Sequence, residues 1–185
     1  MNGTGDTKKV NITIRRATTA DAHDFAYVIC ESWKVAYKDI IPPDVLERNT
    51  NLQKREEIFS SRMKSEEQCY YIAYDGKIPC GVCSTCPSRD ADKNGWGEVV
   101  AIYTLLEYWG TGVGNLLMKV ALEGLRKQGF TRFLLWVFES NPRARRFYEK
   151  CGFFADGTVK EFGHGGAQVV RYIKEILLKY QTAHH

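Results

Sequence analysis

The spacing of apolar residues alternates along the chain between two periods, and each period predicts a different element. Runs rich in β-branched and aromatic residues predict strands over 12–16, 68–74, 77–86, 98–105 and 132–138, from 154 onward and over 168–177. Apolar residues three or four positions apart predict helices over 22–36, over 45–63 with a break near 49–51, and over 113–125. A short helix is predicted after Asn141. The sequence contains no internal repeat, so the pattern predicts one domain in which strands and helices are mixed.

A glycine-rich turn joins the strand at 98–105 to the helix at 113–125. Gly110, Gly112 and Gly114 lack a Cβ atom, so the backbone can curl tightly and approach a ligand closely. The N–H groups of such a turn, together with the helix N-terminus that follows, favour an anion such as a phosphate or pyrophosphate. The turn lacks the Gly-Lys-Ser/Thr of a P-loop, and Asn115 stands where a dinucleotide-binding turn has its third glycine. It therefore fits neither of these two phosphate motifs.

The turn and a second motif resemble the signatures of the GNAT superfamily of acetyl-CoA-dependent N-acetyltransferases. The first signature, Q/R-x-x-G-x-G/A after a strand, is matched by Trp109-Gly-Thr-Gly112-Val-Gly114. The second is an Asn after the next strand, then an Ala and an ending like Tyr-Glu-Lys-x-Gly-Phe, matched by Asn141, Ala144 and residues 148–153. Trp109 departs from the usual Gln or Arg. The loss of that side-chain donor lowers the affinity expected for the cofactor.

The resemblance covers about residues 12–178 and implies the GNAT fold. This is an α/β (α+β) fold with a mixed, mostly antiparallel central sheet of six to seven strands and helices on both faces. An acetyl-CoA slot lies between two splayed central strands. The expected organisation is a disordered lead-in over 1–10, a single GNAT-like acetyltransferase domain over 11–180 and a tail over 181–185.

The activity that the resemblance implies is transfer of the acetyl group of acetyl-CoA to a primary amine by direct attack. An alkyl ammonium has a pKa of about 10.4, so a proton must leave before the nitrogen can attack at neutral pH. Glu98 is the candidate base, directly or through water, because it begins an apolar strand where burial would raise its pKa. Tyr103 and His164 are further options for the base. Tyr148 is the candidate acid for the departing thiolate. The structural alternatives are that Tyr148 packs in the core and that Glu98 is a solvated strand end.

The resemblance also implies where the cofactor binds. Backbone groups from Thr104 to Leu106 would pair with the pantetheine arm like an added strand, and Asn141 would offer its amide to the same arm. The backbone amides of the glycine turn would hold the pyrophosphate. The cofactor residues assigned in this way are Thr104, Leu105, Leu106, Trp109, Gly110, Thr111, Gly112, Val113, Gly114, Asn115 and Asn141.

The first two predicted helices would wall the acceptor side of the site. Trp33 and Tyr37 are expected there as pocket aromatics, with plain core packing as the alternative. The basic residues of the last helix would be near the 3′-phosphate, but a charged helix face is usually only solvated, and the predicted site leaves them out. These residues are Arg143, Arg145, Arg146 and Lys150.

The acceptor is expected to be a small-molecule or peptide amine, and the sequence does not identify it further. A non-catalytic acyl-CoA-binding sensor of the same fold is the alternative function. A homodimer formed through the terminal strands stays open as an option. The net charge of +4 suits an anionic cofactor and is too small to indicate nucleic acid. The polar N-terminus and the longest apolar run, 133–138, predict no signal peptide and no membrane span, and hence a cytoplasmic protein.

Three cysteines at positions 80, 83 and 86 have the spacing C-x-x-C-x-x-C. An iron–sulfur cluster of the bacterial ferredoxin type would need a fourth cysteine near position 90, which is Asp90, and no second ligand pair for zinc is evident. The segment also reads as a strand, in which Cys80 and Cys83 point to opposite faces. We therefore expect small buried side chains here, and no metal.

Overall fold

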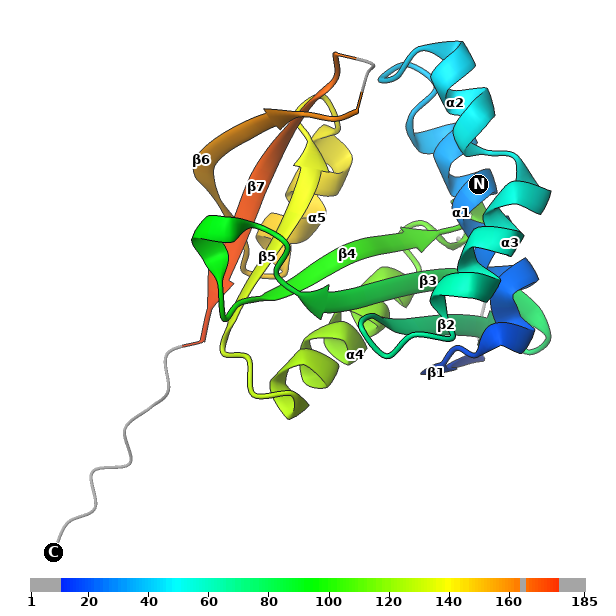
Figure 1. Ribbon diagram of the computed structural model, residues 1–185. Helices are drawn as coiled ribbons and strands as arrows, with labels where there is room; N and C mark the ends of the chain where they lie inside the picture. Colours follow the sequence, from blue (N-terminus) through cyan, green and yellow to red (C-terminus); the bar gives the residue numbers. More distant parts are fainter. Residues whose placement is uncertain (1–10, 164–165, 177–185) are drawn as a thin grey trace, which may run out of the picture.

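The structure, a computed structural model, describes residues 11–163 and 166–176. The predictions for the lead-in, His164 and the tail concern positions outside these ranges. Seven strands form one sheet in the order β1-β2-β3-β4-β5-β7-β6 (Figure 1). The strands are β1 (Ile12–Arg16), β2 (Cys69–Asp75), β3 (Ile78–Pro87), β4 (Gly97–Thr104), β5 (Arg132–Phe138), β6 (Phe154–Glu161) and β7 (Gln168–Glu175). The helices are α1 (Ala22–Ala36), α2 (Pro43–Asn49), α3 (Leu52–Arg62), α4 (Val113–Lys127) and α5 (Pro142–Lys150).

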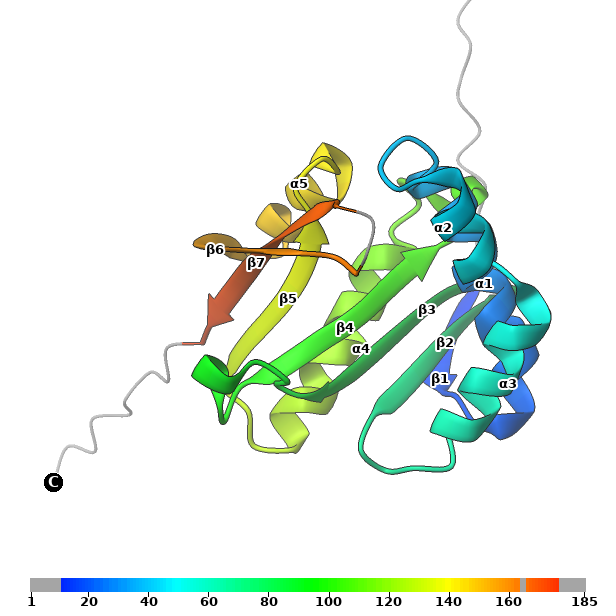
Figure 2. The ribbon, with the colours of Figure 1, turned by 45° about the horizontal axis from the view of Figure 1, so that its top comes forward.

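The predicted mixed, mostly antiparallel sheet is confirmed, and its parallel pair is the one that opens. Every neighbouring pair of strands is antiparallel except β4 and β5. These two pair only between Gly97–Val99 and Phe133–Leu135. Beyond that point β4 continues beside β3 while β5 continues beside β7, so the two strands diverge toward their C-terminal ends (Figure 2). The backbone of β4 from residue 100 onward therefore has no strand on its β5 side.

Helices cover both faces of the sheet, as predicted. In Figure 1, α4 lies behind the sheet, and α1 and α3 lie in front of it. The apolar stripe of α4 is fully buried at Val113, Leu117 and Leu125, a spacing of four and eight residues that places them on one side of a helix. On the other face, the ring of Phe25 in α1 packs at 4.8 Å from that of Phe59 in α3.

The predicted break in the second helical region is confirmed at residues 50–51, between α2 and α3. Asn51 caps α3, and its side chain accepts a hydrogen bond from the backbone N–H of Lys54 at 2.9 Å. An amide oxygen in this position satisfies one of the first free N–H groups of a helix. Two short helices therefore replace one long one.

The polar segment 88–96 between β3 and β4 is held on the sheet by one buried arginine. The side chain of Arg171 in β7 is 4% exposed, and its guanidinium contacts the carboxylates of Asp90 at 3.1 Å and Asp92 at 2.7 Å. Its Nε also binds Asp156 at 2.8 Å. A short 3₁₀ helix, Ala91–Lys93, lies within the segment. Arg171 thereby ties this loop to the β6–β7 hairpin.

The cysteines of β3 behave as core residues. The thiol of Cys83 contacts the carbonyl of Leu117 in α4 at 3.7 Å, and the thiol of Cys80 contacts the carbonyl of Ala73 in β2 at 3.4 Å. Burial raises the pKa of Cys83 well above its ordinary value. Within residues 11–163 and 166–176, no three His, Cys, Asp or Glu side chains are grouped so that they could hold a metal ion. None of the helices described is long and apolar enough to cross a membrane.

Candidate active site

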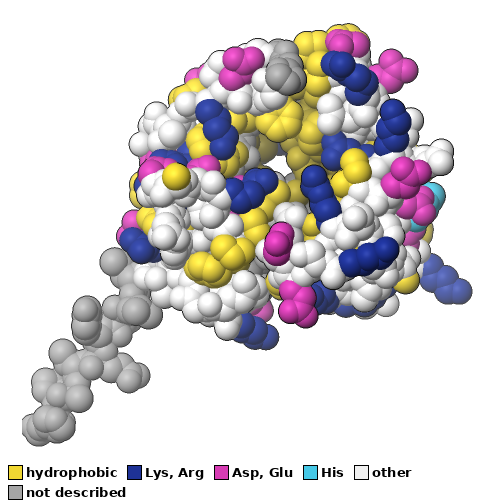
Figure 3. All heavy atoms as spheres, in the orientation of Figure 1, with side chains coloured by type: hydrophobic (Ala, Val, Ile, Leu, Met, Phe, Trp, Pro, Cys, Tyr) yellow, Lys and Arg dark blue, Asp and Glu magenta, His cyan; other side chains and the backbone are white. Residues whose placement is uncertain are grey.

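The divergence of β4 from β5 leaves a cavity of about 450 Å³, a size typical of small-ligand sites. Figure 3 shows it as a hollow with hydrophobic side chains on its floor and Lys and Arg side chains near its rim. Most of the predicted site residues line this one space. They are Trp33, Tyr37, Glu98, Thr104, Trp109, Gly110, Gly112, Gly114, Asn115, Asn141 and Tyr148.

Four predicted cofactor residues lie outside the lining. The N–H of Leu105 donates to the carbonyl of Cys80 in β3, so this group belongs to the sheet. Val113 is fully buried in the core, and the side chain of Leu106 is exposed. The hydroxyl of Thr111 donates to a backbone carbonyl within the turn at 2.7 Å. Alternation along the strand explains Leu105, because successive backbone N–H groups point to opposite sides.

The glycine turn leaves open space at the N-terminus of α4. Gly110 and Gly112 adopt φ values of 78° and 95°, a region that residues with a Cβ atom rarely occupy. A Cβ atom built on either glycine would meet no atom within 4 Å. The glycines are therefore needed for the backbone shape, and the space beside them can hold a ligand. The positive end of the α4 dipole faces this space.

Trp109 reaches from the turn to β4. Its Nε1 donates to the carbonyl oxygen of Thr104 at 3.1 Å, and the hydroxyl of Ser32 in α1 donates to the same oxygen at 3.1 Å. A Gln or Arg at position 109 would extend a flexible donor toward a ligand, whereas the indole N–H is used within the protein. The Thr104 carbonyl, which we predict to pair with the pantetheine arm, thus already has two donors.

Arg143 stacks on Trp109 at the mouth of the cavity. Its Cζ lies 3.1 Å from the centroid of the Trp109 ring, and the residue lines the cavity. Desolvation lowers the pKa of Arg143. The guanidinium has no carboxylate partner among the described residues. Sequence reasoning left Arg143 out, although its place in the first turn after Asn141 is a signal that could have included it.

Asn141 and Tyr148 come from α5, whose start is fixed by local chemistry. The Asn141 side-chain oxygen caps the helix by accepting the N–H of Ala144 at 3.0 Å, and Pro142 occupies the first helical position. Because the cap uses the amide oxygen, the group that Asn141 can offer to a ligand is its NH₂ donor.

The Tyr148 hydroxyl has no side-chain hydrogen bond to the residues that the structure describes. Its ring packs between Phe147 and Phe153, at centroid distances of 5.3 and 6.4 Å. Burial, with a smaller contribution from Tyr103, raises the pKa of Tyr148 well above its ordinary value. The phenol is therefore protonated at neutral pH, and the residue lines the cavity.

Glu98 is 1% exposed and is held by Arg89 of the preceding loop. Its carboxylate accepts the backbone N–H of Arg89 at 3.1 Å, Nε at 3.1 Å and Nη2 at 2.6 Å. The hydrogen bond to Glu98 raises the pKa of Arg89. Glu98 is thus surrounded by apolar strand residues and also forms an ion pair with Arg89. Arg89 lies nine positions earlier in sequence, and only the β3–β4 register brings the two together.

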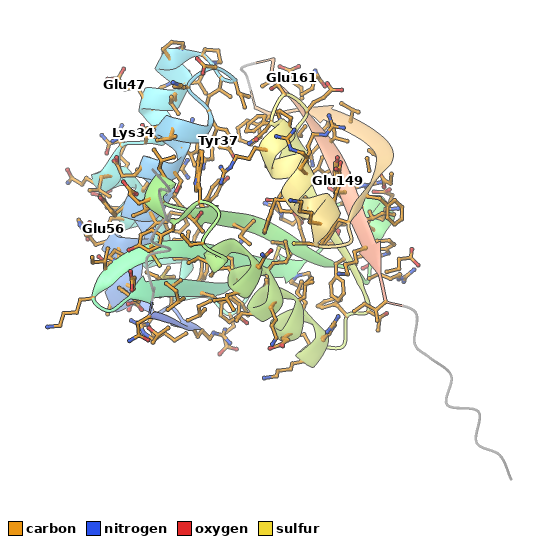
Figure 4. All side chains as sticks on the ribbon, turned by 180° about the vertical axis from the view of Figure 1, so that it is seen from behind. Lys34, Tyr37, Glu47, Glu56, Glu149 and Glu161 are labelled. Atoms are coloured by element: carbon orange, nitrogen blue, oxygen red, sulfur yellow. The ribbon has the colours of Figure 1, made fainter. Side chains whose placement is uncertain are left out.

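Aromatic side chains form the opposite wall of the cavity. The Tyr37 hydroxyl donates to that of Tyr103 at 3.2 Å, and the ring of Trp33 lies 5.0 Å from that of Tyr37. Phe138 and Phe162 pack together at 4.9 Å and complete the wall. In Figure 4, Tyr37 points from the end of α1 into the gap toward α5. Trp33 and Tyr37 therefore both pack in the core and face the cavity, so the two sequence interpretations are compatible.

Comparison with known proteins agrees with this geometry. Residues 29–153 match the model of the acetyltransferase (GNAT) family. The chain is 34% identical over 132 residues to the uncharacterized N-acetyltransferase YuaI of Bacillus subtilis (strain 168), covering 71% of this chain and 74% of that protein. It is 30% identical over 139 residues to an uncharacterized N-acetyltransferase of Archaeoglobus fulgidus, covering 73% of this chain and 88% of that one.

The fold is also similar to solved structures. The crystal structure of PaiA N-acetyltransferase from Thermoplasma acidophilum in complex with coenzyme A has a TM-score of 0.72 at 20% identity, covering 90% of this chain and 99% of that chain. The family match spans the unpaired part of β4, the glycine turn, α4 and the capped start of α5, which together build the cavity. On these grounds the chain belongs to the acetyltransferase (GNAT) family.

Proposed function

We propose that the protein transfers the acetyl group of acetyl-CoA to a primary amine bound against the aromatic wall. The observation that carries this proposal is that the open glycine turn and the Tyr148 hydroxyl face one cavity, beside the part of β4 that has no neighbour on its β5 side. A pyrophosphate site and a proton donor on one space are what thioester aminolysis needs.

The residues present fit acetyl-CoA. The space beside Gly110 and Gly112 admits a phosphate, and Asn141 offers an N–H donor to the pantetheine arm. Trp109 must release the Thr104 carbonyl if that oxygen is to pair with the arm. Arg143, stacked on Trp109, supplies at this mouth a cationic side chain that the motif position itself lacks.

Each reacting proton has a residue to move it. Bound acetyl-CoA supplies an acetyl group activated as a thioester. Glu98 accepts, through a water molecule, the proton that the amine must lose before its lone pair forms the new C–N bond. As the C–S bond breaks, its electron pair stays on sulfur and Tyr148 donates its proton there. The second proton that the nitrogen loses on becoming the amide then passes to the Tyr148 oxygen and restores the phenol, so that one proton in all, the one on Glu98, is released to water. Arg89 acts as a positioning residue because it holds the Glu98 carboxylate by three hydrogen bonds.

Thiol release from acetyl-CoA across a panel of amines tests the proposal. Tyr148→Phe is expected to lower kcat by about 100-fold or more with unchanged cofactor affinity, because it removes a positioned acid but keeps the ring. Tyr27→Phe, on the exposed face of α1, is the matched control and is expected to be neutral. Tight acetyl-CoA binding without turnover on any amine would favour the sensor alternative. Absence of acetyl-CoA binding would refute both.

A further inference from the structure

The aromatic wall contains a buried hydrogen-bond donor that the protein does not use. Trp33 is buried, with only 7% of its surface exposed, yet its indole Nε1 has no hydrogen-bond partner among the described residues. Buried polar groups in proteins are nearly always paired, so an orphan donor on a cavity wall indicates a ligand acceptor. Trp33 lines the cavity, and its Nε1 is buried within this wall, so a ligand reaches the N–H through a small movement of the wall.

Three groups that favour negative charge converge on the same point. The Tyr37 hydroxyl donates to the Tyr103 oxygen at 3.2 Å, and the Arg55 guanidinium lies 5.1 Å from the Trp33 ring centroid. Burial raises the pKa of Tyr103, while Tyr37, Trp33 and Arg55 each act to lower it. The Trp33 N–H lies close enough to the Tyr103 oxygen to lower its pKa, but its geometry falls short of a full hydrogen bond.

Arg55 is fixed in place but is not neutralised. Its Nε donates to the carbonyl of Asn49 at 2.7 Å and its Nη2 to the side-chain oxygen of Asn49 at 3.0 Å. No carboxylate in the described part of the chain pairs with it. Desolvation lowers the pKa of Arg55, as expected for a cation that is partly buried without a counter-ion. An anionic ligand would supply that counter-ion.

Arg55 does not itself line the cavity and acts from beside the Trp33 ring, and the charges that do line the cavity point the same way. Its charged lining residues are Arg89, Arg143, Lys160 and a single acid, Glu98. The Glu98 carboxylate already forms an ion pair with Arg89. In Figure 4, the labelled acids Glu47 and Glu56 of the N-terminal helices lie on their outer side, away from the gap. The described wall therefore offers no free carboxylate to a second ammonium group, which disfavours polyamine acceptors.

We propose that Trp33 Nε1, the Tyr103 hydroxyl and Arg55 form a carboxylate subsite within the acceptor pocket. The acceptor is then an amine that also carries a carboxylate, on an apolar or aromatic body that packs against Phe138 and Phe162. This inference rests on the proposed acetyl transfer, since it names the substrate class of that site. It selects amino-acid-like acceptors over polyamines and over simple alkylamines.

Matched acceptor triplets test it directly. Each triplet keeps one apolar body and one reactive amine and carries a carboxylate, its primary amide or a second amine at the other end. Linear ω-amino acids of four to eight carbons with their amides and diamines form the triplets, and phenylalanine with phenylalaninamide adds one aromatic pair. The expected kcat/KM is higher for the best carboxylate than for its amide or diamine by about tenfold or more, the usual effect of a charge-assisted hydrogen bond.

Two variants assign that preference to the subsite. Trp33→Phe removes the indole N–H and keeps an aromatic ring, and Arg55→Gln removes the charge. Each is expected to reduce the carboxylate-over-amide ratio by about fivefold or more, to raise the KM of the carboxylate and to leave acetyl-CoA affinity unchanged. Arg48→Gln, an exposed arginine on α2, is the matched control. Thermal melting of each variant confirms that it is folded.

Calorimetry separates failure of the subsite from failure of the proposed reaction. It measures binding of the N-acetylated carboxylates and of their amides to the CoA-loaded protein, and so gives an answer even without turnover. Tighter binding of the carboxylates, weakened in the Arg55→Gln variant, supports the subsite. Equal or weaker binding of the carboxylates, or a preference that both variants retain, overturns it. Preferred turnover of the diamines overturns the subsite and leaves the acetyl transfer standing.

Discussion

Replacement of Arg143 by Ala tests whether the arginine that stacks on Trp109 serves the cofactor. In the structure its guanidinium stacks on the indole and has no carboxylate partner among the described residues. A charge-assisted hydrogen bond to a phosphate is worth about 1.5–3 kcal/mol, and an exposed cation–π contact about 0.5–1 kcal/mol. If Arg143 turns from the ring to the phosphate, the net contribution is about 1–2 kcal/mol.

This free energy corresponds to a Kd for CoA that rises by about 5- to 30-fold in the Arg143→Ala variant. Isothermal titration calorimetry at two salt concentrations provides the measurement, and the effect should shrink at high salt because the contact is solvent-accessible. Dephospho-CoA identifies the partner. An equal loss with dephospho-CoA assigns Arg143 to the pyrophosphate, and a loss restricted to CoA assigns it to the 3′-phosphate.

Arg146→Ala is the matched control, because Arg146 lies on the same helix and does not line the cavity. Its Kd should stay close to that of the unmodified protein. An unchanged or tighter Kd in Arg143→Ala would refute the reasoning, since it would mean that the arginine only covers Trp109.

Trp109→Gln, which restores the usual residue of the motif, should strengthen CoA binding and release the Thr104 carbonyl.

Three further predictions concern stability and the glycine turn. Arg171→Met should lower the free energy of unfolding by about 3–5 kcal/mol in denaturant titrations, because it leaves the carboxylates of the 88–96 loop and of β6 without their buried partner; a loss below 1 kcal/mol would contradict this. The hydrogen bond from Arg15 holds the pKa of Asp21 below its ordinary value, so the stabilisation by this pair is complete above about pH 4 and is lost as the pH falls below that value. Asp21→Asn should therefore lower the free energy of unfolding at pH 7, and acid-unfolding curves should show the difference from the unmodified protein narrowing below pH 4. A difference that stays constant with pH would rule the ion pair out. Gly112→Ala should weaken CoA binding and lower the free energy of unfolding by about 1–2 kcal/mol, because φ is 95° at this position. Calorimetry measures the CoA affinity and thermal melting the stability, and no change in either would contradict the prediction.

The features that sequence reasoning predicted are those fixed by neighbouring residues. The strand predicted over 132–138 is observed with the same bounds, because its continuous apolar run must be buried while the polar turns on either side fix where the strand begins and ends. The capped start of α5 was also readable, since Asn141-Pro142 is a local signal. The glycine turn belongs to the same class. Its open space follows from residues that are consecutive in the chain.

The features that were missed join segments far apart in sequence. Arg89 reaches Glu98 only because β3 and β4 pair with a register shift near their loop. Arg143 meets Trp109 only because α5 packs beside the turn, and no spacing rule encodes that contact. The orphan N–H of Trp33 depends on the whole aromatic wall. Contacts between side chains across the cavity depend on the tertiary structure, so neither composition nor local sequence patterns predict them.

The Thr104 carbonyl connects the two halves of the site. It accepts hydrogen bonds from Ser32, the residue before Trp33, and from Trp109 of the cofactor turn. The preceding residue, Tyr103, points its ring into the acceptor wall, because side chains alternate along a strand. Any cofactor that displaces the indole from this oxygen therefore acts next to the proposed carboxylate subsite. The tryptophan that departs from the family motif therefore shares one hydrogen-bond acceptor with the residue next to Trp33.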